Sequence, residues 1–166
     1  MKLKFLESKD IKKVMKIEKK CFPESIRQTK EELLRTIQNK DQIGIIALGR
    51  FGKPIGYVLG APLEFYGNIG NEENYNPDNT FYGESLAVML KERSKGIGSL
   101  LFATMLLEAR KRGFKRYIGH AHEILGFRKA FSPKVIEEIS EYYGDRKKAI
   151  YYEIGLDSII EVGKDD

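Results

Sequence analysis

Hydrophobic residues follow two different spacings along this chain, and each spacing predicts one kind of element. Apolar residues that recur every three or four positions form one face of a helix, whereas short uninterrupted apolar runs are typical of buried strands. The predicted helices cover residues 10–22, 29–37, 96–112 and 133–143. The predicted strands cover residues 2–6, 43–48, 55–60, 80–90, 114–118 and 147–156.

Capping residues support several of these boundaries. Thr29 and Glu32 have the spacing of a capping box at the start of the second helix. Gly113 suits the left-handed position that follows the end of a helix. Ser132 and Pro133 form a typical N-cap and first-turn pair, so we expect the fourth helix to begin there.

The order of these elements is βααβββαβαβ, which predicts a single α/β domain. We place that domain at residues 1–156, followed by a frayed tail at 157–166. The segment 64–79 shows no periodicity and is rich in Asn, Gly and Pro. It is therefore predicted to be a long loop, of the kind that is often functional or mobile.

Composition narrows the class of protein. The chain has 166 residues, of which 42% are hydrophobic and 32% charged, a mixture typical of globular domains and not of disordered chains. Its single cysteine, Cys21, excludes a disulfide framework and a zinc site built from several cysteines. No apolar run approaches the roughly 20 residues that a membrane span needs, and the N-terminus leads into charged residues. We therefore expect a cytoplasmic protein with no membrane partner.

Positive charge gathers in one part of the sequence. The segment 91–134 holds 11 basic and 3 acidic residues, although the whole chain has a net charge of only +5. Such a segment beside a glycine-containing turn suggests a ligand that carries phosphate. Nucleic acid is disfavoured because the segment lacks both an aromatic stacking stripe and the pattern of a recognition helix.

The most informative stretch runs from a strand into a helix over residues 86–99. Gly96 and Gly98 would let the backbone approach a ligand closely, and the first N–H groups of the helix lack internal partners. Such N–H groups bind phosphate oxygens, and Arg93 and Lys95 would add charged contacts. The stretch is neither a Walker A loop nor a Rossmann turn, which needs a third glycine.

Read as L-A-V-x-x-x-x-R-S-K-G-I-G-S, this stretch resembles the pyrophosphate motif of the GNAT superfamily of acetyl-CoA-dependent N-acetyltransferases. The predicted element order also matches that family. Ile17-Glu18, Cys21-Phe22-Pro23 and Tyr142-Tyr143 look like the protein N-terminal acetyltransferases of the ribosomal-protein alanine type. The resemblance implies a mixed, mostly antiparallel central sheet flanked by helices, with acetyl-CoA as co-substrate and no metal.

The resemblance also implies which residues bind the co-substrate. Residues 86–88 would line the pantetheine arm, and the Val88 N–H would point at the acetyl carbonyl as an oxyanion donor. The turn at 94–99 would hold the pyrophosphate mainly through its main chain. The full set of implied cofactor-binding residues is Leu86, Ala87, Val88, Arg93, Ser94, Lys95, Gly96, Ile97, Gly98 and Ser99.

The catalytic groups are less well determined by the sequence. His120 lies where alanine-type relatives place a catalytic carboxylate, and the ordinary histidine pKa near ~6.5 suits a base. Glu84 is the second candidate, because a period of two would place it on the same strand face as Leu86 and Val88. The alternative role for His120 is a structural histidine at the end of a strand. Tyr143 is the candidate general acid.

Three further alternatives stay open at this point. Tyr82 shares the expected face of Glu84, and Tyr142 could replace Tyr143, although either tyrosine of that pair could instead pack in the core. His120 and His122 could bind metal with Glu123, but no third strong ligand is evident.

The function predicted from these features is transfer of acetyl from acetyl-CoA to a primary amine. The preferred acceptor is the N-terminal amine of a protein or peptide. A small cationic amine resembling a polyamine is the alternative acceptor, and a non-catalytic CoA-binding module is the alternative class. The sequence leaves the oligomeric state open and is compatible with a dimer.

Overall fold

The computed structural model describes residues 1–67, 76–121, 126–140 and 149–159. The strands are β1 (Lys2–Phe5), β2 (Ile43–Leu48), β3 (Pro54–Pro62), β4 (Thr80–Val88), β5 (Arg116–Ala121), β6 (Lys134–Ile139) and β7 (Ala149–Gly155). The helices are α1 (Ile11–Cys21), α2 (Lys30–Ile37), α3 (Leu63–Tyr66), α4 (Ile97–Lys111) and α5 (Gly126–Lys129). No helix among these described residues is long and apolar enough to cross a membrane.

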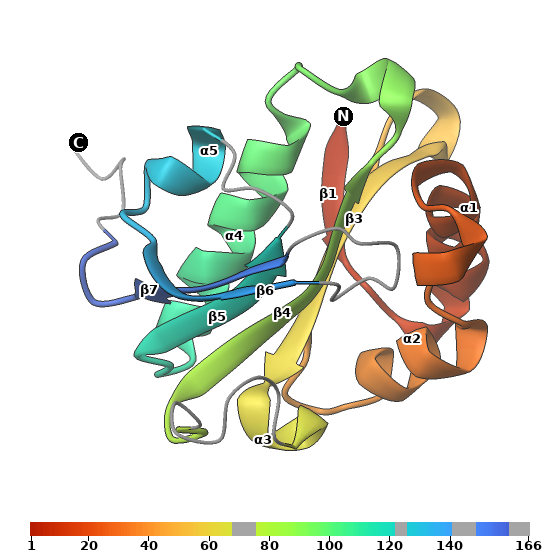
Figure 1. Ribbon diagram of the computed structural model, residues 1–166. Helices are drawn as coiled ribbons and strands as arrows, with labels where there is room; N and C mark the ends of the chain where they lie inside the picture. The colour runs from red at the N-terminus through yellow and green to blue at the C-terminus, as the bar shows by residue number, and fades with distance from the viewer. Residues whose placement is uncertain (68–75, 122–125, 141–148, 160–166) are drawn as a thin grey trace.

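The seven strands form one sheet in the order β1-β2-β3-β4-β5-β7-β6. All neighbouring strands are antiparallel except β4 and β5, which run parallel. Helices α1 and α2 cover one face of the sheet and α4 covers the other, as Figure 1 shows. The predicted mixed, mostly antiparallel sheet flanked by helices is therefore confirmed.

Each face of the sheet has its own hydrophobic core. Helix α4 is apolar nearly all round, and its Leu101, Phe102 and Met105 are buried against the sheet. On the other face, α1 is amphipathic and buries Val14 and Ile17. The predicted capping box is present at the start of α2, where the Thr29 hydroxyl and the Glu32 carboxylate each bind the other's backbone N–H.

The predicted helix over 133–143 is wrong where the structure describes it, because residues 134–139 form strand β6. Ser132 has a φ of 50°, which is not an N-cap conformation, and β6 pairs with β7 along its length. A register shift between Val135 and Glu137 turns Ile136 and Ile139 toward the same hydrophobic cluster. Ile136 and Ile139, three positions apart on one face, therefore gave the spacing that is typical of an amphipathic helix. The short α5 is the next described element after β5, and it is the last helix among the described residues.

A β-bulge in β4 opens the sheet. Leu59 pairs with Ser85 and Gly60 pairs with Gly83, so Glu84 is an extra residue with no partner in β3. The parallel pairing of β4 with β5 ends at Gly83. From the bulge onward the two strands separate, which leaves room for a ligand between them.

Candidate active site

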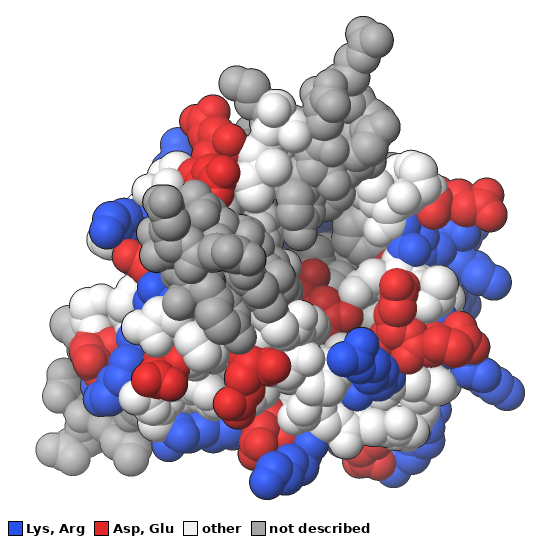
Figure 2. Space-filling view, turned by 60° about the horizontal axis from the view of Figure 1, so that its bottom comes forward, with Lys and Arg blue, Asp and Glu red and all other residues white. Residues whose placement is uncertain are grey.

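A cavity of about 690 Å³ lies where β4 and β5 separate. Its walls come from α1, the α1–α2 connection, the second half of β4, the turn before α4, the end of β5 and α5. Figure 2 shows acidic side chains at the edge of a hollow near the middle of one face of the molecule. Elements that are far apart in sequence therefore build one site.

The turn before α4 has the backbone geometry of an anion-binding site. Ser94 and Gly96 both have positive φ, at 61° and 78°. The first hydrogen bond inside α4 runs from Leu100 N–H to the Gly96 carbonyl at 2.9 Å, so the N–H groups of 97–99 have no partner within the helix. A Cβ added at Gly98 would approach only the Val88 side chain, at 3.7 Å. The turn therefore has room and N–H donors for a pyrophosphate.

The side chains of this turn serve different purposes. Arg93 Nε donates a 3.0 Å hydrogen bond to the Val88 carbonyl, so Arg93 holds the end of β4 beside the cavity. Lys95 pairs with Glu92 at 2.9 Å, and its side chain does not line the cavity. The Ile97 side chain is buried in the core on the α4 face. Neither the Lys95 nor the Ile97 side chain lines the cavity in this structure.

The backbone of Val88 faces the opened side of β4. Met89 N–H bonds the Ile55 carbonyl of β3 at 2.9 Å, and alternate residues of an antiparallel strand point to opposite edges. The Val88 carbonyl accordingly accepts from Arg93 and from the Cys21 thiol, which are not part of β3. The Val88 N–H shares this orientation, which is the one that an oxyanion donor needs.

Glu84 faces α1 and α2, whereas Leu86 and Val88 pack toward α4. The expectation that all three share one face is therefore wrong. The bulge places Glu84 and Ser85 consecutively on the α1 side and shifts the alternation of every later residue by one. The expected shared face of Glu84 and Tyr82 agrees with this arrangement, since both rest against Tyr66 of α3.

Hydrogen bonds from neighbouring side chains hold the Glu84 carboxylate. Gln28 Nε2 donates to Oε1 at 2.5 Å, and Tyr66 donates its hydroxyl to Oε2 at 2.6 Å. Burial raises the pKa of Glu84 above its ordinary value, and hydrogen bonds from Thr36, Tyr66 and Gln28 oppose the rise only in part. Glu84 is thus a buried carboxyl on the cavity wall that titrates closer to neutral pH than an exposed glutamate.

His120 also lines the cavity, at the end of β5. Its Nδ1 lies 3.0 Å from the Tyr82 hydroxyl, and its ring stacks on Tyr151 with 4.7 Å between ring centroids. Burial lowers the pKa of His120 to about 4, so the imidazole is neutral at physiological pH. The other candidates Tyr142, Tyr143, His122 and Glu123 lie outside the described residues.

The sequence reasoning did not single out Glu18 as a site residue. This carboxyl is 1% exposed, lines the cavity, and accepts hydrogen bonds from the Tyr57 hydroxyl and from Gln28 N–H, the latter at 3.1 Å. Tyr57 also lies 2.8 Å from the Ser85 hydroxyl. An acid at the i+4 position from buried Val14 is a signal that could have revealed Glu18, because that position faces the core.

The comparison that decides the family is a family model described as Acetyltransferase (GNAT) family, which matches residues 11–127. The chain belongs to this GNAT family. The match spans the buried acid of α1, the bulge, the glycine turn and the end of β5. Family membership confirms acetyl-CoA as the predicted co-substrate, and the backbone geometry of the glycine turn fits its pyrophosphate.

Solved GNAT structures share this fold. The ribosomal-protein-S18-alanine N-acetyltransferase from Escherichia coli is 14% identical with a TM-score of 0.75, and the match covers 98% of this chain and 97% of that one. The GNAT-like decarboxylase GphF in complex with isobutyryl-CoA is 19% identical with a TM-score of 0.74, covering 94% and 100%. A phosphinothricin acetyltransferase from Sinorhizobium meliloti in complex with acetyl-CoA is 16% identical with a TM-score of 0.72, covering 93% and 88%. No curated protein sequence matches the chain.

Metal ligands do not gather in the described part of this GNAT domain. Those residues contain no group of three or more His, Cys, Asp or Glu side chains placed to hold a metal ion.

Proposed function

We propose that this protein transfers acetyl from acetyl-CoA to the N-terminal amine of a protein or peptide. The observation that carries the proposal is the arrangement across the cavity. The anion-binding turn and the Val88 N–H lie on one wall, and the buried Glu84 carboxylate lies on another. Acetyl-CoA bound by the turn and an amine bound by Glu84 would meet at the bulge of β4.

The walls on the acceptor side favour a charged amine on an otherwise apolar group. Phe22 and Ile26 line the cavity beside the carboxylates of Glu18 and Glu84. An α-ammonium group could bind the carboxylates while the first side chain of a peptide contacts the apolar pair. The fold shared with ribosomal-protein-alanine N-acetyltransferases supports this acceptor.

A small cationic amine is the second candidate acceptor. The same two carboxylates would attract it, and the fold is also shared with an aminoglycoside 6'-acetyltransferase. Such an acceptor would use the carboxylates without needing the apolar pair. Substitution of Phe22 therefore distinguishes the two acceptors, because only a peptide should lose affinity.

Acetyl-CoA supplies an activated acetyl group. The residues of this chain would stabilise the charge that develops during the transfer and would accept and donate the protons. The amine nitrogen bonds the acetyl carbon, the carbon–sulfur bond breaks, and the thiolate leaves with its electron pair. The Val88 N–H would stabilise negative charge that develops on the acetyl oxygen. The amine must give up a proton, and the thiolate must gain one.

Glu84 is the proton acceptor that the site favours. A base works best when its pKa lies near the working pH, and burial moves the pKa of Glu84 in that direction. Burial moves the pKa of His120 to about 4, which makes its neutral imidazole a weak base. We therefore assign Glu84 as the base ahead of His120. Tyr143 remains the candidate that returns a proton to the thiolate.

The test is acetyl transfer to a peptide with a free N-terminal alanine, to the same peptide with a blocked N-terminus, and to spermidine. We expect transfer only to the free peptide, and kcat lowered by at least about a hundredfold in Glu84→Gln with unchanged acetyl-CoA affinity. Transfer to spermidine alone would favour the small-amine acceptor. Tight acetyl-CoA binding without transfer to any amine would support a non-catalytic CoA-binding module instead.

A further inference from the structure

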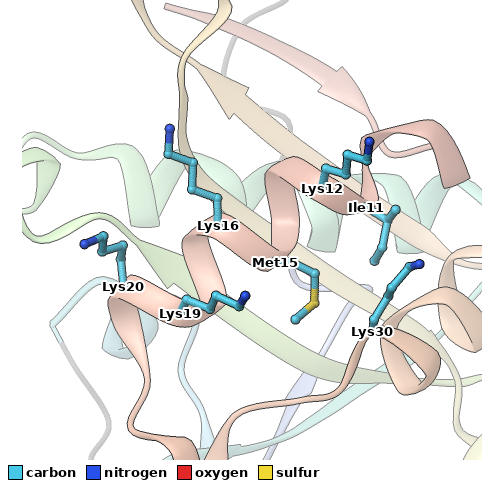
Figure 3. A pocket seen from close by; sticks show the side chains of 7 residues that line it. All are labelled: Ile11, Lys12, Met15, Lys16, Lys19, Lys20 and Lys30. Carbon is cyan, nitrogen blue, oxygen red and sulfur yellow. The ribbon is translucent and has the colours of Figure 1, made fainter.

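A second hollow, of about 400 Å³, lies against the outer side of α1. Lys12, Lys16, Lys19 and Lys20 line it from α1, and Lys30 lines it from the first turn of α2. Figure 3 shows Lys19 and Lys30 extending toward Met15 and Ile11, and Lys12, Lys16 and Lys20 projecting from α1 in other directions. We call this feature the lysine groove. It lies on the opposite side of α1 from the cavity, which Glu18 and Cys21 of the same helix line.

The positive charge of the lysine groove is not balanced locally. Helix α1 contains five lysines and a single acid, and that acid, Glu18, is buried. Only Lys13 of these lysines forms an ion pair with a described residue, at 3.3 Å from Asp10, and Lys13 does not line the groove. No Asp or Glu among the described residues lines the groove either.

This distribution of charge opposes the stability of the helix. Lys16 lies four residues from both Lys12 and Lys20, and like charges at that spacing destabilise an α-helix. Lys12 also lies in the first turn, where the helix dipole disfavours positive charge. All five groove lysines are exposed, so the packing of the core does not require them. A bound anionic partner would offset this repulsion, because its negative groups would attract the lysines.

The floor of the groove indicates the chemistry of that partner. Ile11 and the adaptable Met15 provide apolar surface between the ammonium groups, and the lysine stems extend it. Among the residues that the structure describes, no aromatic or arginine side chain lines the groove, and these residues offer no platform for a stacked base. A segment with carboxylates on both sides of one apolar side chain would pair with the lysines and pack on the apolar floor.

We propose that the lysine groove docks an acidic segment of the acceptor protein, a few residues after the N-terminus that enters the cavity. This step rests on the proposed acetylation of an N-terminal amine. A helix with its side chains is about 10–12 Å across, so a chain that passes around it covers half of its circumference, roughly 16–19 Å, which about five extended residues span. The acidic segment would therefore begin near the sixth residue of the acceptor.

The test compares two peptides that share their first five residues, Ala-Gly-Ser-Gly-Ser. One continues with Glu-Asp-Leu-Glu-Asp and the other with Gln-Asn-Leu-Gln-Asn. We expect the acidic peptide to have a KM roughly tenfold lower, with equal kcat. The variant Lys12→Gln/Lys16→Gln/Lys19→Gln should abolish that difference. The matched control Lys2→Gln/Lys40→Gln/Lys53→Gln removes the same charge from exposed sites elsewhere and should preserve it.

The outcomes separate this proposal from the proposed function. Equal KM values for the two peptides in the unmodified protein would overturn docking and leave acetylation intact. Acetylation of neither peptide, together with groove-dependent binding of the fluorescein-labelled acidic peptide, would overturn the function and retain the groove. An RNA oligonucleotide of equal charge that displaces the labelled peptide at lower concentration would assign the groove to nucleic acid and overturn the proposal.

Discussion

Gln28 connects the two buried carboxyls of the cavity. Its side-chain amide donates to Glu84 at 2.5 Å, and its backbone N–H donates to Glu18 at 3.1 Å. The connection between α1 and α2 is thereby fixed against both the helix and the bulge of β4. The wall of the cavity around Glu18 and Glu84 consequently depends on residues from three separate elements. A change in one of these residues should alter the pKa of the neighbouring carboxyl groups.

The first prediction concerns the pH dependence of acetyl transfer. Tyr66→Phe removes one hydrogen bond that stabilises the Glu84 carboxylate and keeps the aromatic ring. Losing a bond to the charged form raises the pKa of Glu84, so the acid limb of kcat/KM should move up by about one pH unit. The measurement is the pH–rate profile with a saturating acyl donor.

Tyr82→Phe provides the matched control for that profile. This change removes a hydroxyl that lies beside His120 Nδ1 and leaves the hydrogen bonds from Gln28 and Tyr66 to Glu84 in place. We expect the acid limb to stay where it is. Should Tyr82→Phe move the limb while Tyr66→Phe leaves it unchanged, His120 would replace Glu84 as the base.

The second prediction concerns the anion-binding turn. Gly98→Ala should be about as stable as the unmodified protein, because its Cβ meets only the Val88 side chain at an ordinary 3.7 Å. Gly98→Asp should abolish CoA binding by placing a carboxylate on the phosphate path. Gly96→Asp should do the same and also strain the backbone, since Gly96 has a φ of 78°. Urea denaturation measures the first effect and calorimetric titration with CoA the other two, and unchanged affinity in a folded Gly98→Asp protein would remove the pyrophosphate from this turn.

The third prediction concerns the close packing just before the bulge. A Cβ at Gly83 would lie 2.0 Å from the Tyr117 hydroxyl, so Gly83→Ala should lower the free energy of unfolding by about 1–3 kcal/mol. Gly155→Ala, where a Cβ meets nothing within 4 Å, is the control. Adding Tyr117→Phe to Gly83→Ala should recover part of the loss, because the ring still crowds the site. Urea denaturation compares the variants, and equal stability of both glycine variants would contradict the contact.

The fourth prediction concerns Asp10, which is 1% exposed and contacts Lys4 at 2.7 Å. Burial alone would raise the pKa of Asp10, but hydrogen bonds from Lys4, from Glu7 N–H and from Lys13 hold it below its ordinary value. Asp10 therefore contributes stability above its unfolded pKa of about 3.9 and loses it as the pH falls through the lower folded pKa. Asp10→Asn should cost about 1 kcal/mol at pH 7.

The pH series makes this prediction specific. The difference in unfolding free energy between Asp10→Asn and the unmodified protein should shrink as the pH falls below about 4. The exposed Asp41→Asn serves as the control and should differ little from the unmodified protein at any pH. A difference that stays constant down to low pH would mean that Asp10 acts through packing and not through its charge.

Elements whose signal is contained in neighbouring residues were predictable from the sequence. The capping box at Thr29, the amphipathic α1 and the apolar α4 all depend on contacts within one turn or one helix face. The glycine turn at 94–99 belongs to the same group, because its N–H donors and positive φ angles are properties of the local backbone. For this reason the backbone geometry of this turn was predictable before the fold was known.

The sequence by itself determined the family, the order of most elements and the anion-binding turn. Only the tertiary structure decided the faces of β4 and β6, because each strand contains a bulge whose position depends on pairing with another strand. Those bulges turn Glu84 toward Gln28 and make Ile136 and Ile139 neighbours on one face. The spacing of hydrophobic residues along the chain cannot reveal how these strands pair. The pairing register is set by hydrogen bonds between residues that are far apart in sequence.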